Sequence, residues 1–275
     1  MSKRFVYYNA GIAAALLMLD LFPDAEVGHS LRKLRNGYTG SCIRVRRSSD
    51  NAEQDIGFNS NNTIDLVTLN SFVGSDSAYI VIWYDQSLNG NNFIQSVQLN
   101  QFRIVVSGVT ETSNGFPTIY AYSLNSSMES SSLSHLSEGE MFMIVEGDTI
   151  YGSKASWNFG SDIQVCHYPY ISTDIYENFG SNTRRGPYTP VTDIGDMNIY
   201  NVLSANNNWK VFVNNEALTA ATSNVVSFST SPILGKHYGR NSSQFKITEL
   251  IIYPTNKDTD RGDIKTSLND YYAMY

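Results

Sequence analysis

The chain has 275 residues, a formal net charge of -7 at pH 7 and only 16% charged residues. This acidic balance argues against nucleic acid as the main partner, because phosphate binding needs a basic face. The two cysteines, Cys42 and Cys166, could pair, but two cysteines make no disulfide framework, and we favour free buried thiols. No Cys/His group has structural-zinc spacing and no dinucleotide fingerprint is present, so we predict neither metal nor cofactor.

The N-terminus carries the apolar run Gly11–Leu19 after two basic residues, as in a secretory signal, but no small-residue cleavage site follows. The run is also too short to span a bilayer. We predict an attachment or oligomerisation arm over residues 1–26, with a helix over Asn9–Leu21 whose apolar side needs a partner surface. The residues expected to make assembly contacts are Phe5, Tyr7, Ile12, Leu16 and Leu19.

Residues 27–275 are predicted to form one β-rich domain, because short apolar runs alternate with turn signals. Helices are expected over Val27–Arg35, over Ile64–Phe72 with Thr63 as its cap, and, at the end, over Asp258–Tyr275. The continuous apolar run in Gln244–Tyr253 is typical of a strand covered on both faces. The other expected strands are Ser41–Arg47, Ala78–Tyr84, Met141–Glu146, Ile150–Phe159, Ile163–Ile171, Asn198–Leu203 and Trp209–Val213, with tight turns at Asn89–Gly90 and Asn214–Asn215. This order predicts a mainly β, antiparallel sandwich or jelly roll.

Two resemblances refine the expected fold. Gly28–Phe58 and Ile80–Asn91 resemble the start of the catalytic domain of the α-L-arabinofuranosidase B family. Trp209–Leu218, Ser231–Gly239 and Phe245–Tyr272 resemble the closing half of laminin-G-like domains. Both resemblances imply a concanavalin A-like jelly roll.

The first resemblance implies a retaining glycosidase, which needs two carboxylates about 5–5.5 Å apart. In that family the nucleophilic Glu follows a segment with two adjacent cysteines. The corresponding stretch here, about Tyr151–Ile171, has only Cys166, and the matching position falls near His167–Tyr170. The family's acid/base Asp lies just after a late Leu-Gly, where this chain has Arg240. Asp162 and Asp174 remain as alternative candidates for the catalytic carboxylates. We therefore predict no catalytic residues.

Two further groups of residues are candidates for binding or structure. A glycan-binding surface could use aromatic rings and polar turn residues, although most aromatics of a sandwich belong to its core. Its candidates are Trp83, Tyr84, Asp85, Asn89, Asn91 and Trp157. A basic strand next to an acidic loop could form an acidic-sugar or cation pocket, but a network that pins the loop is favoured. Its members are Arg44, Arg46, Arg47, Asp50, Glu53 and Asp55.

The combined motifs also resemble structural proteins of tailed bacteriophages. We therefore predict a non-enzymatic virion protein, as a head or tail fibre, decoration or tail-associated subunit. It would be a homo-oligomer in the virion, docked to other virion proteins by its N-terminal segment, with host-surface polysaccharide as a further partner and neither nucleic acid nor membrane insertion. Two alternatives stay open: a glycoside hydrolase of the α-L-arabinofuranosidase type with relocated carboxylates, and a carbohydrate-binding module of a bacterial surface protein.

Overall fold

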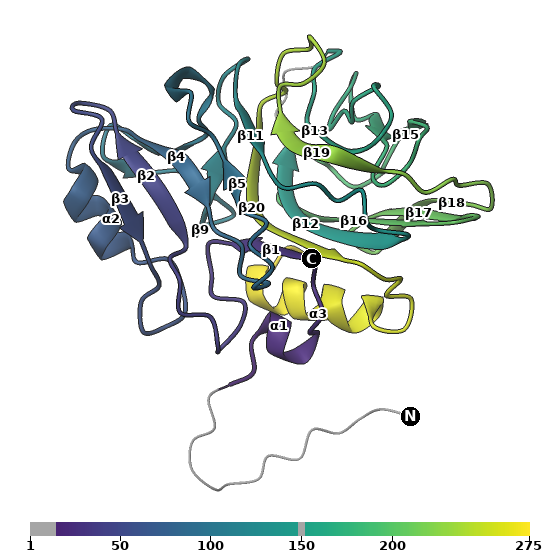
Figure 1. Cartoon of the computed structure of the whole chain (residues 1–275), viewed down its shortest axis with the longest axis horizontal. Coiled ribbons are helices and arrows are strands. Elements are labelled where there is room, and N and C mark those ends of the chain that lie inside the picture. The colour runs from purple at the N-terminus through teal and green to yellow at the C-terminus, as the bar shows by residue number, and fades with distance from the viewer. Residues whose placement is uncertain (1–14, 148–151) are drawn as a thin grey trace, which may run out of the picture.

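The computed structural model describes residues 15–147 and 152–275, which form a mainly β domain. One antiparallel sheet of sixteen strands runs through this part of the chain, in the order β13-β19-β11-β5-β4-β6-β10-β20-β12-β16-β17-β18 with four strands paired beside that path (Figure 1). Its strands are β1 (Val27–Ser30), β2 (Ile43–Arg47), β3 (Glu53–Ile56), β4 (Ala78–Trp83), β5 (Phe93–Ile94), β6 (Arg103–Val106), β7 (Val109–Thr110), β10 (Ile119–Tyr120), β11 (Ser127–Glu129), β12 (Gly139–Gly147), β13 (Trp157–Gly160), β16 (Asn198–Ala205), β17 (Asn208–Val213), β18 (Glu216–Ala221), β19 (Phe228–Gly235) and β20 (Phe245–Tyr253).

The remaining elements are short. Two small hairpins pair β8 with β9 and β14 with β15. Their bounds are β8 (Thr112–Ser113), β9 (Phe116–Pro117), β14 (Ile175–Glu177) and β15 (Arg185–Tyr188), and the helices are α1 (Met18–Leu21), α2 (Leu66–Val73), the 3-10 turn η1 (Gln98–Asn100) and α3 (Arg261–Tyr272).

The sheet folds back on itself, so that strands far apart in the order face each other across the core. Trp157 of β13 packs on Tyr200 of β16, with ring centroids 5.7 Å apart, and on Phe245 of β20 at 5.8 Å. The predicted antiparallel sandwich is therefore confirmed.

The predicted two-sided burial of β20 is also confirmed. Leu250 and Ile252 belong to the main core between the layers, whereas Ile251 and Tyr253 belong to a second core. Figure 1 shows α1 and α3 on this second side, below β12 and β20. This alternation explains why all four residues Leu250–Tyr253 at the end of the strand are apolar.

One predicted helix is a strand. Val27–Ser30 pairs antiparallel with Glu249–Ile252 of β20, so the expected helix over Val27–Arg35 is wrong. The reason is non-local: the edge of β20 supplies a hydrogen-bond ladder that the local apolar spacing cannot reveal. Gly28 fits because a Cβ there would meet Leu19 Cδ1 at 3.0 Å.

Two further local predictions differ from the structure. Ile163–Ile171 forms no strand, and the region Ile150–Phe159 contributes only β13 among the residues described. Asn89–Gly90 lies in a longer loop between β4 and β5, where Leu88 and Gly90 both have positive φ. The other predicted strands and helices are present with slightly shifted ends.

The predicted arm is only partly described. Phe5, Tyr7 and Ile12 lie outside the described residues, as does the first part of the predicted helix Asn9–Leu21, and its described part is helical only over Met18–Leu21. Leu16 is 61% exposed, but Leu19 is buried in the second core. The described end of this segment therefore packs on the domain. Among the described helices, none has the length and hydropathy needed to cross a membrane.

Candidate functional site

Glu177 is a fully buried carboxyl group at the end of β14. Its Oε1 accepts hydrogen bonds from the backbone N–H groups of Asn178 and Phe179, both at 2.8 Å. Its Oε2 accepts from Trp157 Nε1 at 3.0 Å and from the Cys166 thiol at 3.3 Å. These donors come from β13, from the loop between β13 and β14 and from the two residues after β14, and they hold both carboxyl oxygens in one orientation.

Burial raises the pKa of Glu177, and the hydrogen bonds from Trp157, Asn178 and Cys166 oppose that rise. Burial and the Glu177 carboxyl group also raise the pKa of the Cys166 thiol, which is therefore protonated and donates. A buried carboxyl group with a perturbed pKa and a fixed orientation is a candidate for proton transfer or nucleophilic attack.

His167 follows Cys166 along the chain and contacts Arg184. His167 Nδ1 is 2.5 Å from the Lys154 carbonyl oxygen, and Nε2 is 2.8 Å from Arg184 Nη1. The contacts assign the tautomer, because Nδ1 must donate to the carbonyl group while Nε2 accepts from the guanidinium. Desolvation and the charges of Arg184 and Arg240 together lower the pKa of His167 to about 4, and the hydrogen bond with the Lys154 carbonyl group opposes this shift.

Aromatic rings surround the histidine. The rings of His167 and Tyr170 are 4.9 Å apart, and those of Tyr170 and Tyr176 are 5.2 Å apart. The guanidinium of Arg184 lies 4.4 Å from the centre of the Tyr176 ring. We call His167, Tyr170, Tyr176, Arg184 and Arg240 the arginine cluster.

Arg240 follows β19, in the segment where the family resemblance places an acid/base carboxylate. It donates from Nη1 to the hydroxyl group and the carbonyl group of Ser153. The segment Leu234–Asn241 contains no carboxylate.

The two aspartates left open by the sequence border the cluster, and both are partly exposed. Asp162 accepts from the backbone N–H of Gln164 at 2.9 Å and from that of Arg184 at 2.6 Å. Asp174 accepts from the Thr189 hydroxyl group at 2.6 Å. No hydrogen bond in the described chain joins either aspartate to Glu177.

The sequence prediction missed Glu177, although a signal was present. The family rule asks for a glutamate after the cysteine segment, and Glu177 is the first glutamate after Cys166. The stretch expected to correspond to the family's nucleophile, about Tyr151–Ile171, ends before Glu177. Both cysteines are free and buried, as predicted.

The predicted glycan-binding residues do not form an exposed platform. The rings of Trp83 and Trp157 are fully buried, so neither has a face free for a sugar. Asp85 is 5% exposed and accepts from the backbone N–H groups of Gly28, Ser87 and Asn91. Asp85 therefore fixes the loop between β4 and β5.

Three other candidates from that group also hold the loop. Asn89 and Asn91 donate to the carbonyl group of Glu26. The hydroxyl group of Tyr84 donates to Asp55 at 2.8 Å. These contacts tie the loop after β4 to the residues before β1 and to β3.

The favoured charge network is present on β2 and β3. Arg44 binds Asp55 through two hydrogen bonds of 2.8 Å, and Arg47 Nη2 lies 2.7 Å from Asp50. Arg46 departs from the prediction, because it donates to Gln101 and Asn51, while Glu53 only lies opposite it in the strand register. These contacts account for the basic strand and acidic loop without a ligand.

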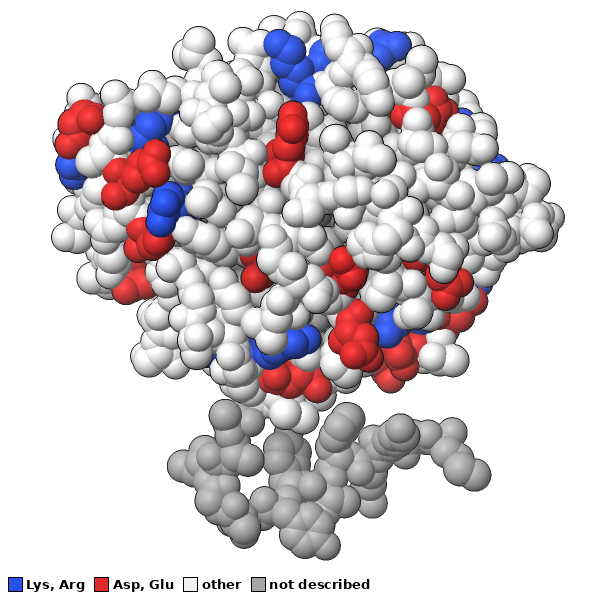
Figure 2. Space-filling view, in the orientation of Figure 1, with Lys and Arg blue, Asp and Glu red and all other residues white. Residues whose placement is uncertain are grey.

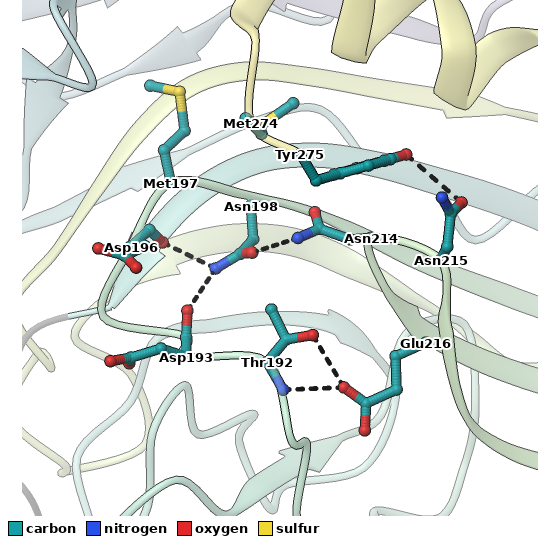
Figure 3. A pocket seen from close by; sticks show the side chains of 10 residues that line it. All are labelled: Thr192, Asp193, Asp196, Met197, Asn198, Asn214, Asn215, Glu216, Met274 and Tyr275. Carbon is teal, nitrogen blue, oxygen red and sulfur yellow. Dashed lines mark hydrogen bonds between the residues drawn. The ribbon is translucent and has the colours of Figure 1, made fainter.

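A polar pocket of about 370 Å³ lies on the surface near the C-terminus, between the start of β16 and the β17–β18 turn (Figure 3). Glu216 accepts from Thr192, and Asn198 donates to the carbonyl groups of Asp193 and Asp196. The remaining lining residues are Met197, Asn214, Asn215, Met274 and Tyr275. In the described chain no group of three His, Cys, Asp or Glu side chains could hold a metal ion. The internal contacts explain this pocket as a structural feature.

Comparisons with known proteins point to glycosidases. The family model of the catalytic domain of α-L-arabinofuranosidase B matches residues 25–110. A probable α-L-arabinofuranosidase B of Aspergillus flavus is 33% identical over 75 residues, which are 27% of this chain and 15% of that protein.

Two similar solved structures are a mutant GH54 α-L-arabinofuranosidase soaked with 4-nitrophenyl α-L-arabinofuranoside and a GH54 enzyme soaked with a cyclic sulfate inhibitor. Their TM-scores are 0.61 and 0.62 and their identities 17% and 16%. In both comparisons 89% of this chain and 62% of the other chain are covered, so this chain spans less than two thirds of those structures. At this identity the likeness establishes the β-sandwich fold.

These findings correct the function predicted from the sequence. The prediction of a non-enzymatic bacteriophage virion protein is wrong, because the family model, the fungal relative and the solved structures all belong to glycosidases. The resemblance to the α-L-arabinofuranosidase B family is supported. The resemblances to bacteriophage structural proteins and to laminin-G-like domains are not supported. The homo-oligomer and the host-surface polysaccharide partner stay predictions.

Proposed function

We propose that this chain is a glycoside hydrolase of the α-L-arabinofuranosidase type, with Glu177 as its nucleophile. The observation that carries the proposal is the match of residues 25–110 to the catalytic domain of that family. Glu177 supplies the carboxyl group that the chemistry needs, and it lies against the only cysteine of its region, Cys166.

In a retaining mechanism the ionised nucleophile attacks the anomeric carbon, while a second carboxyl group protonates the leaving oxygen. The ionised Glu177 would be stabilised by its two backbone N–H donors and the Trp157 indole. Arg240 cannot be the acid, because a guanidinium does not give up its proton at neutral pH. Asp162 and Asp174 are therefore the candidates for the proton donor.

Substrate must reach a carboxyl group that is fully buried. The β14–β15 hairpin carries Glu177 and forms a two-stranded sheet of its own, separate from the main sheet. A shift of this hairpin would uncover the carboxyl group without breaking the main ladder, and we include that shift in the proposal.

The test is hydrolysis of 4-nitrophenyl α-L-arabinofuranoside, followed by release of nitrophenol. We expect Glu177→Gln to lower kcat/KM by about 10³-fold or more, since a nucleophile cannot be replaced by an amide. Glu53→Gln, which alters an exposed carboxyl group on β3, is the matched control and keeps wild-type activity. A comparable loss in either Asp162→Asn or Asp174→Asn identifies the proton donor. Folded wild-type protein without hydrolysis, or an active Glu177→Gln variant, would refute the proposal.

A further inference from the structure

Neither Arg184 nor Arg240 forms an ion pair within the described residues. The ion pairs found there involve other basic side chains. Asp162 accepts from the backbone N–H of Arg184 instead of from its guanidinium, and Asp174 accepts from the hydroxyl group of Thr189. In an acidic protein of net charge -7, two guanidinium groups without an ion-pair partner need an explanation.

The guanidinium of Arg184 is held in place by neutral groups. It donates one hydrogen bond to His167 Nε2 at 2.8 Å and stacks on Tyr176 at 4.4 Å. Its other guanidinium N–H groups have no further side-chain partner in the described chain, and none is a buried, unsatisfied nitrogen. Arg184 therefore presents solvated donors in a fixed orientation, which lowers the entropy lost on binding an anion.

Arg240 lies in the same electrostatic neighbourhood. Its charge acts on His167, as that of Arg184 does, and its Nη1 rests on Ser153. Ser153 precedes Lys154, whose carbonyl group binds His167. Figure 2 shows basic side chains gathered along the top of the molecule, at the end where β13 and β19 lie in Figure 1.

The cluster shares backbone with the proposed catalytic carboxyl group. His167 and Tyr176 form a bridge, and their chain neighbours Cys166 and Glu177 contact each other. The Arg184 charge also acts on the Cys166 thiol. Tyr170 and Tyr176 are partly exposed beside the arginines and offer ring surface to a sugar. Charge, oriented donors and aromatic surface thus occur together at one place.

We propose that Arg184 and Arg240 bind an anionic group, the carboxylate of a uronic acid, on the saccharide residues next to the bond that is cleaved. Guanidinium groups match carboxylates by paired, charge-assisted hydrogen bonds. A site for an uncharged glycoside alone would have no use for two guanidinium groups without an ion-pair partner. The position of this subsite in a reaction depends on the proposed hydrolase function, but its anion binding does not.

The experiment is calorimetric titration of the full chain with three probes: xylotriose carrying one glucuronic acid branch, unbranched xylotriose, and inorganic sulfate. We expect the acidic saccharide to bind at least tenfold more tightly than the neutral one, with sulfate weaker than the acidic saccharide. Arg240→Gln and Arg184→Gln should each weaken binding of the acidic saccharide about tenfold or more, because each removes hydrogen bonds to a charged group.

Lys236→Gln is the matched control. It removes one positive charge from the segment that holds Arg240, but Lys236 contacts Asn125 instead of the cluster. We expect it to leave the affinity for the acidic saccharide within twofold of wild type. Melting temperatures of the three variants check that each is folded, and Arg240→Gln provides the test if Arg184→Gln unfolds.

Equal affinity for the acidic and neutral saccharides would overturn the inference, as would sulfate binding as tightly as the acidic saccharide. An equal loss of affinity in Lys236→Gln would also overturn the inference, because it would show that only the net charge of the protein matters. These outcomes are separate from the failure of the proposed function, because binding is measured without turnover. Discrimination between the saccharides by a protein that hydrolyses no arabinofuranoside would support the subsite and reject the hydrolase.

Discussion

At the scale of single residues, the function depends on how the surroundings of Glu177 set its ionisation. Burial raises the pKa of this group, and the Trp157 indole opposes that effect. A nucleophile must be ionised, so activity falls when the pH drops through the raised pKa.

We therefore expect the acidic limb of the kcat/KM profile to lie above 4.5, the ordinary pKa of a glutamate. Trp157→Phe keeps the ring but removes the N–H donor, so it should move this limb to still higher pH. Profiles of wild type and variant from pH 3 to 8 check both statements. A limb at or below the ordinary value, or a variant limb that moves down, would contradict this account of Glu177.

His167 predicts a second pH effect, this time on stability. Its pKa of about 4 in the folded state lies below the ordinary value of 6.5, so the unfolded chain binds a proton that the folded chain does not between these values. The stabilisation is complete above pH 6.5 and is lost as the pH falls toward 4. The free energy of unfolding should lose roughly 3 kcal/mol from this group over that range.

Urea denaturation at pH 7 and at pH 4.5 measures the loss, which should be much smaller in His167→Gln. His135→Gln, at an exposed site, is the control and should keep the wild-type pH dependence. An unchanged dependence in His167→Gln would show that another group is responsible.

At the scale of elements, local signals located α2 but not its cap. The spacing of Leu66, Leu69 and Phe72 predicts this helix, and Thr63 was the expected cap. The structure uses Asp65, whose carboxylate accepts from the backbone N–H of Thr68 at 3.0 Å and from its hydroxyl group at 2.6 Å. We expect Asp65→Ala to cost about 1 kcal/mol in thermal or urea unfolding and Thr63→Ala clearly less. A larger loss of stability in Thr63→Ala than in Asp65→Ala would show that Thr63 is the cap.

The attachment of α3 depends on a buried ion pair that no local pattern reveals. Arg261 Nε lies 2.5 Å from the Glu140 carboxylate, which is fully buried on β12. Arg261→Met would leave that charge without its partner, at a cost of about 3–5 kcal/mol. Lys210→Gln, which removes a partly exposed ion pair with Asp258 and leaves Arg261 paired with Glu140, should cost under about 1 kcal/mol. Similar midpoints in urea for both variants would contradict a structural role of the buried pair.

Elements that depend on local patterns could be predicted from the sequence, whereas features that depend on contacts between distant residues could not. The apolar run of β20 was recognised because burial on both faces is written into consecutive residues. β1 was mistaken for a helix because its stability comes from pairing with β20, more than two hundred residues away along the chain. Glu177 was missed for a different reason: the stretch expected to contain the family's glutamate ended at Ile171, six residues before it.

At the scale of the whole molecule, the sandwich brings β13, the loop after it and the β14–β15 hairpin together around one carboxyl group. The matched family segment, residues 25–110, belongs largely to the other half of the sheet. The fold was predictable from strand patterns and motifs, whereas the function predicted from absent carboxylates was wrong. The error arose because a carboxylate was sought at one expected position in the sequence instead of among the side chains that the fold assembles.

The most direct measurement is covalent trapping with a cyclic sulfate inhibitor of arabinofuranosidases, followed by peptide mapping of the modified chain by mass spectrometry. A retaining hydrolase with Glu177 as its nucleophile predicts one sugar adduct, on the peptide that contains Glu177, and none in Glu177→Gln. An adduct on another carboxyl group, or no adduct on folded wild-type protein, would contradict the account.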